Sequence, residues 1–147
     1  MPIKQFKRPG SASAAAMSAI FCVMLAISSS CATEDPNANL QRYDGTWQVL
    51  QTNGGTPLKQ NAAASFAAPR IALFVSTNSI LASGTLDPDG SFDATSVTQT
   101  LLACTDAEVA LEFAILDLMR SHPRFTDNPD GTLTIEAAPY SMLLRRN

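Results

Sequence analysis

Three aspartates, Asp87, Asp89 and Asp93, stand close enough together in the sequence to suggest a calcium site. An EF-hand loop alternates oxygen ligands with other residues, has glycine at its sharp turn and closes with a glutamate. Counted from Asp87, the turn position is Phe92 and no glutamate closes the loop. The spacing therefore predicts the tip of a β-hairpin and no metal site.

The single histidine and one internal cysteine are the other candidates for catalysis. His122 lies beside Pro123, just past the predicted end of a helix, where a cation is favourable, so we interpret it as a helix-end residue. Without a second histidine, the serines have no other base for a hydrolase triad. Cys104 has apolar neighbours, which raise the pKa of a thiol, and we predict that it packs in the core. The sequence thus predicts no catalytic residue, no cofactor and no metal.

The N-terminus has the layout of a secretory signal peptide. Basic residues within 4–8 precede an apolar run, residues 14–27, and three serines follow before Cys31. The apolar run is shorter than the roughly 20 residues that a membrane-spanning helix needs. We assign residues 1–30 to the signal peptide and the polar residues 31–43 to a flexible tether.

Cys31 resembles the lipid-modified cysteine of bacterial lipoproteins, because it follows an apolar stretch and small residues. Ala32, and not aspartate, comes next, which by the lipoprotein pattern predicts an anchor on the periplasmic side of the outer membrane. The alternative is ordinary cleavage after Ala32, giving a soluble periplasmic or secreted protein. If Cys31 is retained without lipid, a disulfide with Cys104 is conceivable in an oxidising compartment.

Charge excludes one class of partner. Removing residues 1–30 takes away three basic and no acidic residues, which moves the formal net charge from −3 to −6. The acidic remainder has no Lys/Arg cluster of the kind that neutralises phosphates. We therefore expect no nucleic-acid binding, and the only membrane contact that we predict is through a lipid on Cys31.

The clearest predicted element is a helix over residues 106–120, preceded by a strand-like run that begins at Thr98. Thr105 and Glu108 have the spacing of a capping box, in which each side chain takes a backbone N–H at the helix start. Apolar residues fall on two sides of this helix, which predicts burial on more than one side, with Phe113 in the core and Glu112 on a polar strip. The two apolar sides are Leu111, Ile115 and Leu118, and Val109, Phe113 and Leu116.

Short strands are predicted for most of the remaining chain. Residues 87–90 and 128–131 share the pattern Asx-Pro-Asp-Gly, which is typical of a type I turn, so each should close a hairpin. Residues 56–68 have no clear period and are predicted to be a loop, with Leu58 and Phe66 packing inward. The predicted strands are 46–51, 70–75, 79–84, the hairpins 81–86 with 91–94 and 124–127 with 132–137, and 140–145.

The resulting fold class is α+β and mainly β: a small antiparallel curled sheet, or cracked β-barrel, of seven to eight short strands with one buried helix. The residues predicted to form its structural core include Trp47, Cys104, Phe113 and Leu116.

Four segments together resemble the META domain family, which includes envelope and heat-shock lipoproteins of bacteria. They are Gly45-Thr46-Trp47, Thr98-Gln99-Thr100-Leu101-Leu102-Ala103-Cys104, Gly131-Thr132-Leu133-Thr134-Ile135 and Leu143-Leu144-Arg145-Arg146. The Gly-Cys-Asn motif that is usual in the family is replaced by the shorter, cysteine-free stretch 76–84. The resemblance covers a domain at residues 44–147 and implies a cracked barrel with a helix in its opening. It also implies an accessory, non-enzymatic role in the envelope or in stress.

Two functions remain open at this point. The first is a non-catalytic cell-envelope accessory lipoprotein that assists assembly or the stress response through contacts with an unknown envelope protein. The alternative is a lipocalin-like barrel that binds a small hydrophobic ligand. A helix that packs inward would fill the space that such a ligand needs, which favours the first function.

Overall fold

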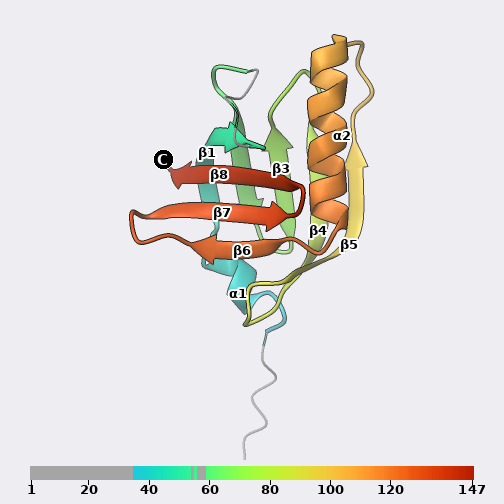
Figure 1. Ribbon diagram of the computed structural model, residues 1–147. Helices are drawn as coiled ribbons and strands as arrows, with labels where there is room; N and C mark the ends of the chain where they lie inside the picture. The colour runs from blue at the N-terminus through green and yellow to red at the C-terminus, as the bar shows by residue number, and fades with distance from the viewer. Residues whose placement is uncertain (1–34, 54, 56–58) are drawn as a thin grey trace, which may run out of the picture. The chain divides into compact units, whose positions relative to one another are not determined.

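The computed structural model describes residues 35–53, 55 and 59–147 (Figure 1). The predicted signal peptide, Cys31 and Leu58 lie outside the described residues, which form one compact unit. Neither helix in the described part of the chain has the length and apolar character needed to span a membrane.

Eight antiparallel strands form a single curled sheet in the order β5-β4-β3-β2-β1-β8-β7-β6. The order shows two meanders, β1 to β5 and β6 to β8, which are joined where the first strand pairs with the last. The strands are β1 (Gly45–Thr52), β2 (Ala63–Ala67), β3 (Arg70–Phe74), β4 (Ile80–Leu86), β5 (Phe92–Gln99), β6 (Arg124–Asp127), β7 (Thr132–Ala137) and β8 (Tyr140–Arg146).

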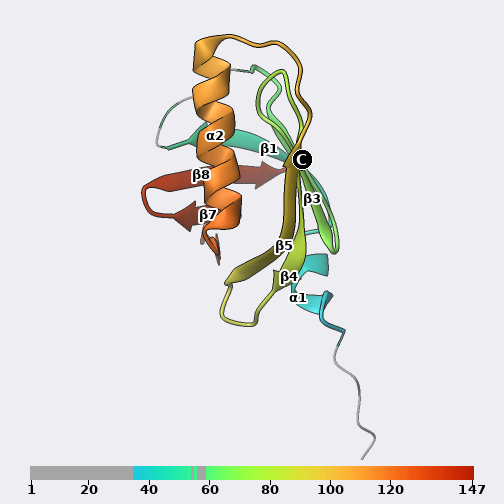
Figure 2. The same ribbon diagram turned by 90° about the vertical axis from the view of Figure 1, so that its right-hand side faces the viewer.

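The sheet curls into an open half-barrel whose two edge strands meet at one end only. Phe92 N–H donates to the Pro123 carbonyl at 2.9 Å, and Phe125 N–H donates to the Gly90 carbonyl at 2.8 Å. Beyond these bonds the edges diverge, and helix α2 (Asp106–Arg120) lies alongside β5 in the opening (Figure 2). The predicted fold class is confirmed.

Helix α2 begins where the capping box predicts. Glu108 N–H donates to Thr105 Oγ1 at 3.3 Å, and Thr105 N–H donates to Glu108 Oε2 at 2.9 Å. Both hairpin turns also form: Gly90 N–H donates to the Asp87 carbonyl, and Gly131 N–H to the Asn128 carbonyl, each at 3.0 Å. Hydrogen bonds between residues that are close in the sequence thus set the start of α2 and the positions of both hairpin turns.

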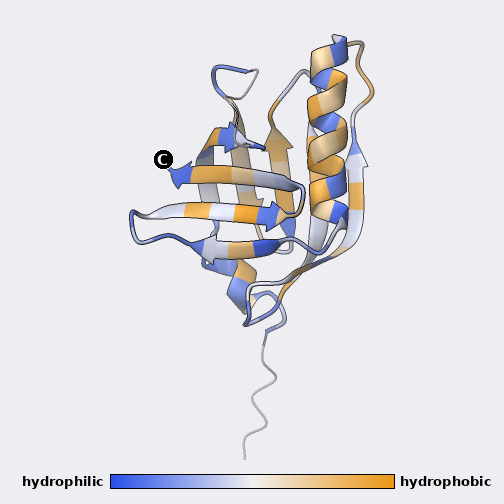
Figure 3. Ribbon diagram, in the orientation of Figure 1, coloured by the Kyte–Doolittle hydropathy of each residue, from blue (hydrophilic) through white to orange (hydrophobic). Residues whose placement is uncertain are grey.

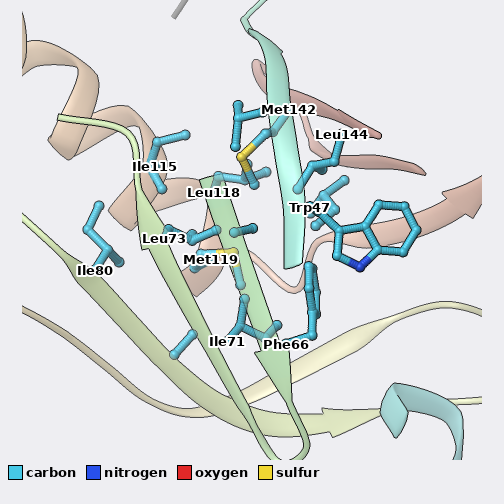
Figure 4. Packing of buried hydrophobic residues seen from close by; sticks show 14 of the residues in the cluster. Trp47, Phe66, Ile71, Leu73, Ile80, Ile115, Leu118, Met119, Met142 and Leu144 are labelled. Atoms are coloured by element: carbon cyan, nitrogen blue, oxygen red, sulfur yellow. The ribbon is translucent and has the colours of Figure 1, made fainter. Parts of the chain in front are cut away.

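One continuous face of α2 enters the core. Ile115, Leu118 and Met119 are fully buried, and Figure 4 shows them among side chains contributed by the strands. Phe113 is 59% exposed, whereas Glu112 is 3% exposed. The prediction that Phe113 lies inside and Glu112 outside is therefore wrong, whereas Leu116, predicted on the same side as Phe113, lies in the core with 5% exposure.

Aromatic side chains gather at one end of the core. Trp47 is 5% exposed, and its ring centroid lies 6.0 Å from those of both Tyr43 and Phe66. Phe125 lies 5.6 Å from Phe92 between ring centroids, so that the aromatic cluster extends to the point where the edge strands meet. Such tilted and edge-on pairs add to the stabilisation from burial alone.

Two segments are more ordered than the sequence predicts. Residues 63–67, which we predicted to belong to a loop, form β2, in which Ala64 and Phe66 alternate inward. The predicted tether ends earlier than residue 43, because helix α1 (Ala38–Gln41) buries Leu40, and Tyr43 is 2% exposed. The first segment was not predicted as a strand because its alanines have weak strand propensity. The second was not predicted as part of the domain because its composition is mostly polar.

Candidate functional site

Asp87 and Asp89 form hydrogen bonds within the hairpin turn that contains them. Asp89 accepts hydrogen bonds from Ser91 N–H at 2.9 Å and from Ser91 Oγ at 3.1 Å, and these bonds lower the pKa of Asp89. His122, with a φ of 50°, follows the C-terminal cap of α2, and its Nδ1 lies 3.3 Å from Asp93 Oδ1 at the surface. Nothing in the described ranges groups three or more His, Cys, Asp or Glu side chains as metal ligands.

A different polar cluster lies where the β3–β4 turn meets the start of α2. Asn78, which is 2% exposed, accepts a hydrogen bond from Leu102 N–H at 2.7 Å and donates to the Leu102 carbonyl at 3.2 Å. Its Oδ1 also accepts from Thr100 Oγ1 at 3.0 Å. One asparagine therefore holds residues 100–102 in place as a loop, although the sequence suggested that the strand continues there.

Glu112 is buried because this turn supplies its hydrogen-bond donors. Its Oε1 accepts from Ser76 Oγ, from Asn78 N–H at 3.3 Å and from Asn78 Nδ2 at 3.1 Å. Asn78 Nδ2 also lies 3.1 Å from Oε2. Buried carboxylates persist only when such bonds or a counter-charge compensate for lost hydration. These donors explain why a charged residue takes the inward position next to Phe113.

Cys104 lies beside this cluster, and the prediction that it packs in the core is wrong. The side chain is half-buried, outside the core cluster, and its free Sγ lies 3.8 Å from Asn78 Nδ2. Desolvation, followed by the negative charges of Glu112 and Glu108, raises the pKa of the Cys104 thiol. A raised pKa leaves little thiolate near neutral pH, so the residue is a poor nucleophile.

A surface groove opens between α2 and the segment that leads into it. Its volume is about 360 Å³. Figure 3 colours much of α2, and part of the segment that leads into it, as hydrophobic. Three large apolar side chains beside it are exposed: Leu101 by 85%, Leu102 by 61% and Phe113 by 59%. The lining residues are Asn78, Gln99, Leu101, Leu102, Ala103, Cys104, Val109, Glu112 and Phe113.

Sequence reasoning missed this groove for two reasons. It assigned Phe113 to the core because large aromatic residues are usually buried. It also gave no role to the polar residues 76–78, which connect the predicted strands 70–75 and 79–84, although Asn78 organises the site. The usable signal was the pair Leu101-Leu102, which stands two residues before the helix cap Thr105. Adjacent residues of a strand point to opposite faces, so both leucines could not face the core from one strand.

The structure is a small half-open β-barrel domain with an apolar surface groove beside its single long helix. A family model for the META domain matches residues 38–147, and the chain belongs to this family. The predicted resemblance is confirmed, with a domain start several residues earlier than residue 44.

Solved structures agree with the fold. One protein structure determined by NMR has 17% sequence identity and a TM-score of 0.57, covering 68% of this chain and 86% of that one. An NMR structure of a protein from Burkholderia xenovorans has 15% identity and a TM-score of 0.56, covering 97% and 99% of the two chains. A comparison with curated proteins finds no match.

Proposed function

We propose that the chain is a non-catalytic accessory protein of the cell envelope that works by holding a segment of another protein in the groove. The observation that carries the proposal is the exposure of Leu101, Leu102 and Phe113 around one concave site. A cluster of exposed apolar side chains is typical of an interaction site, whereas single exposed apolar residues are common on any protein surface. Membership of the META domain family, which has no known catalytic activity, agrees with a binding role.

The proposal includes a location. The signal-like N-terminus and Cys31 favour a lipid anchor on the periplasmic side of the outer membrane, and the family resemblance favours a role in assembly or stress. Cys31→Ser should release the protein from membranes. Intact mass of the mature wild-type chain is the second measurement: a chain that begins at Thr33 without an acyl group would rule out the anchor.

Photo-crosslinking tests the protein contact directly. A photoreactive amino acid placed at Leu101 in the full chain should form adducts with an envelope protein in living cells. The matched control carries the same amino acid at Thr126, an exposed position on β6 away from the groove. Adducts of equal yield at the two positions, or none at either, would refute a partner in the groove.

The lipocalin-like alternative keeps one supporting observation, because a volume of about 360 Å³ also suits a small ligand. Such a ligand would bind in the groove, since Ile115, Leu118 and Met119 fill the space inside the sheet. Native mass spectrometry of protein purified from its own membrane decides between the two. A stoichiometric small molecule that survives gentle ionisation would favour the ligand-binding function.

A further inference from the structure

The floor of the groove carries a carboxylate without a counter-charge. Glu112 lines the groove while being 3% exposed, and no basic side chain of the described residues lies within salt-bridge distance of it. Among the described residues, those that line the groove likewise include no Lys or Arg. A buried carboxylate that meets only neutral donors still favours an added positive charge.

Two acceptor atoms in this groove have unused hydrogen-bonding capacity. Glu112 Oε1 accepts from Ser76 Oγ and from Asn78 N–H, and it shares one N–H of Asn78 Nδ2 with Oε2, which accepts no other bond. Gln99 Oε1 is also buried, and it has no hydrogen-bond partner in the described part of the chain. Each carboxylate or amide oxygen can accept about two bonds, so both atoms can take a further donor.

The pattern of free acceptors selects one kind of cation. An ammonium group is a compact charge with three donors, which suits acceptors on two different side chains. A guanidinium group pairs best with two free oxygens of one carboxylate, and Glu112 Oε1 is already occupied. The aliphatic stem of a lysine can also pack along apolar walls while its charged end reaches a polar floor.

We propose that the groove binds a lysine side chain of the partner protein. The lysine ammonium group contacts Glu112 and Gln99, and apolar residues next to that lysine in the partner segment pack against Leu101, Leu102 and Phe113. This proposal rests on the proposed function, because it assumes that the occupant is a protein segment. The exposed apolar side chains favour such a segment over a free amine, since they extend the contact surface beyond the charged floor.

Cys104 provides a reporter for charge preference inside the groove. Its Sγ and the Glu112 carboxylate share Asn78 Nδ2 as a neighbour, so a short group attached to the thiol reaches the carboxylate. The full chain with Cys22→Ser and Cys31→Ser keeps this thiol alone. It is equilibrated with cystamine, hydroxyethyl disulfide or dithiodipropionate, each with its own thiol. In each exchange, the Cys104 thiolate attacks one probe sulfur, a new S–S bond forms, and the other half leaves as a thiol.

Intact mass gives the fraction of each mixed disulfide, and the same measurement in urea corrects for intrinsic differences between probes. The folded protein should favour the ammonium probe over the hydroxyl probe by about five- to tenfold, as expected for a partly buried charge pair, and should disfavour the carboxylate probe. No preference beyond the urea value would overturn the proposal. This comparison leaves Glu112 and Gln99 unchanged and therefore decides even if Glu112 variants fail to fold.

Variants assign the preference to named atoms. Glu112→Gln should abolish it, and Gln99→Leu should reduce it by about twofold, because one of two acceptors is lost. Asp106→Asn removes a charge from the first turn of α2 outside the groove and is the matched control; it should retain most of the preference. An equal loss in Asp106→Asn and Glu112→Gln would show that only the general field of the helix end is acting.

The crosslinking experiment separates this inference from the proposed function. A crosslinked envelope protein whose captured segment has a lysine among apolar residues supports both. A captured segment without lysine overturns the inference and leaves the proposed function standing. Ammonium preference at Cys104 without any protein adduct at Leu101 would instead identify a free amine as the ligand and overturn both.

Discussion

Glu112 is buried and Phe113 is exposed, the reverse of the prediction, and substitutions at these two residues give the sharpest test of how α2 is oriented. Glu112→Ala removes the acceptor for Ser76 Oγ and for Asn78 N–H, and both of these residues are 2% exposed. Without Glu112 these donors keep only long bonds within the turn, from Ser76 Oγ to the Asn78 carbonyl at 3.4 Å and from Asn78 N–H to Ser76 Oγ at 3.3 Å. A poorly bonded buried donor costs about 1–3 kcal/mol, so we expect the free energy of unfolding to fall by about 2–4 kcal/mol. Against a typical total of about 5–15 kcal/mol, this is a large loss.

Phe113→Ala is the matched comparison on the next residue of the helix. More than half of the Phe113 side chain already faces solvent, so its removal should cost less than about 1 kcal/mol. Urea unfolding followed by the fluorescence of Trp47, the only tryptophan and a buried one, measures both values. A Glu112→Ala protein as stable as wild type, or a Phe113→Ala protein that loses more, would refute the orientation of α2 described above.

Three further changes test other parts of the fold. Leu40→Ala should lower the free energy of unfolding by about 2–4 kcal/mol in the same urea assay, because Leu40 is fully buried, and a silent change would show that α1 is not part of the folded domain. Gly84→Ala should cost more than about 2 kcal/mol, since its Cβ would collide with the Asp93 carbonyl and lie 2.9 Å from Ala94 Cα; a normal melting temperature would contradict this packing. Hydrogen bonds from Thr105 and Thr77 lower the pKa of Glu108 from 4.5 to about 2, so Glu108 stabilises the fold above pH 4.5 and this contribution is lost as pH falls toward 2. The difference in melting temperature between wild type and Glu108→Gln should therefore shrink over that interval, and a constant difference would count against it.

Elements with local polar signals were predictable from the sequence. Thr105 and Glu108 mark the start of α2, and the two Asx-Pro-Asp-Gly turns mark both hairpins, because each signal acts within a few residues. Strand β2 was missed because alanine has little strand propensity, and its place depends on pairing with β1 and β3.

The candidate site was not predictable in the same way. The buried position of Glu112 depends on Asn78 and Ser76, which are more than thirty residues away in the chain. Periodicity can place residues on sides of a helix but cannot say which side meets donors from a distant turn. Phe113 was therefore wrongly predicted to lie in the core, and the groove beside it was not predicted.

The pairing of β1 with β8 has a consequence for how the chain folds. The first strand lies in the middle of the sheet, and its second neighbour is the last strand that the chain supplies. Forming a contact between strands so far apart in the sequence is slow. Until β8 pairs with β1, one edge of β1 stays open, and a strand of another chain could pair with it. We therefore expect a chain truncated before Tyr140 to aggregate instead of forming a smaller stable sheet, because the C-terminal strand acts as the clasp that joins the two meanders.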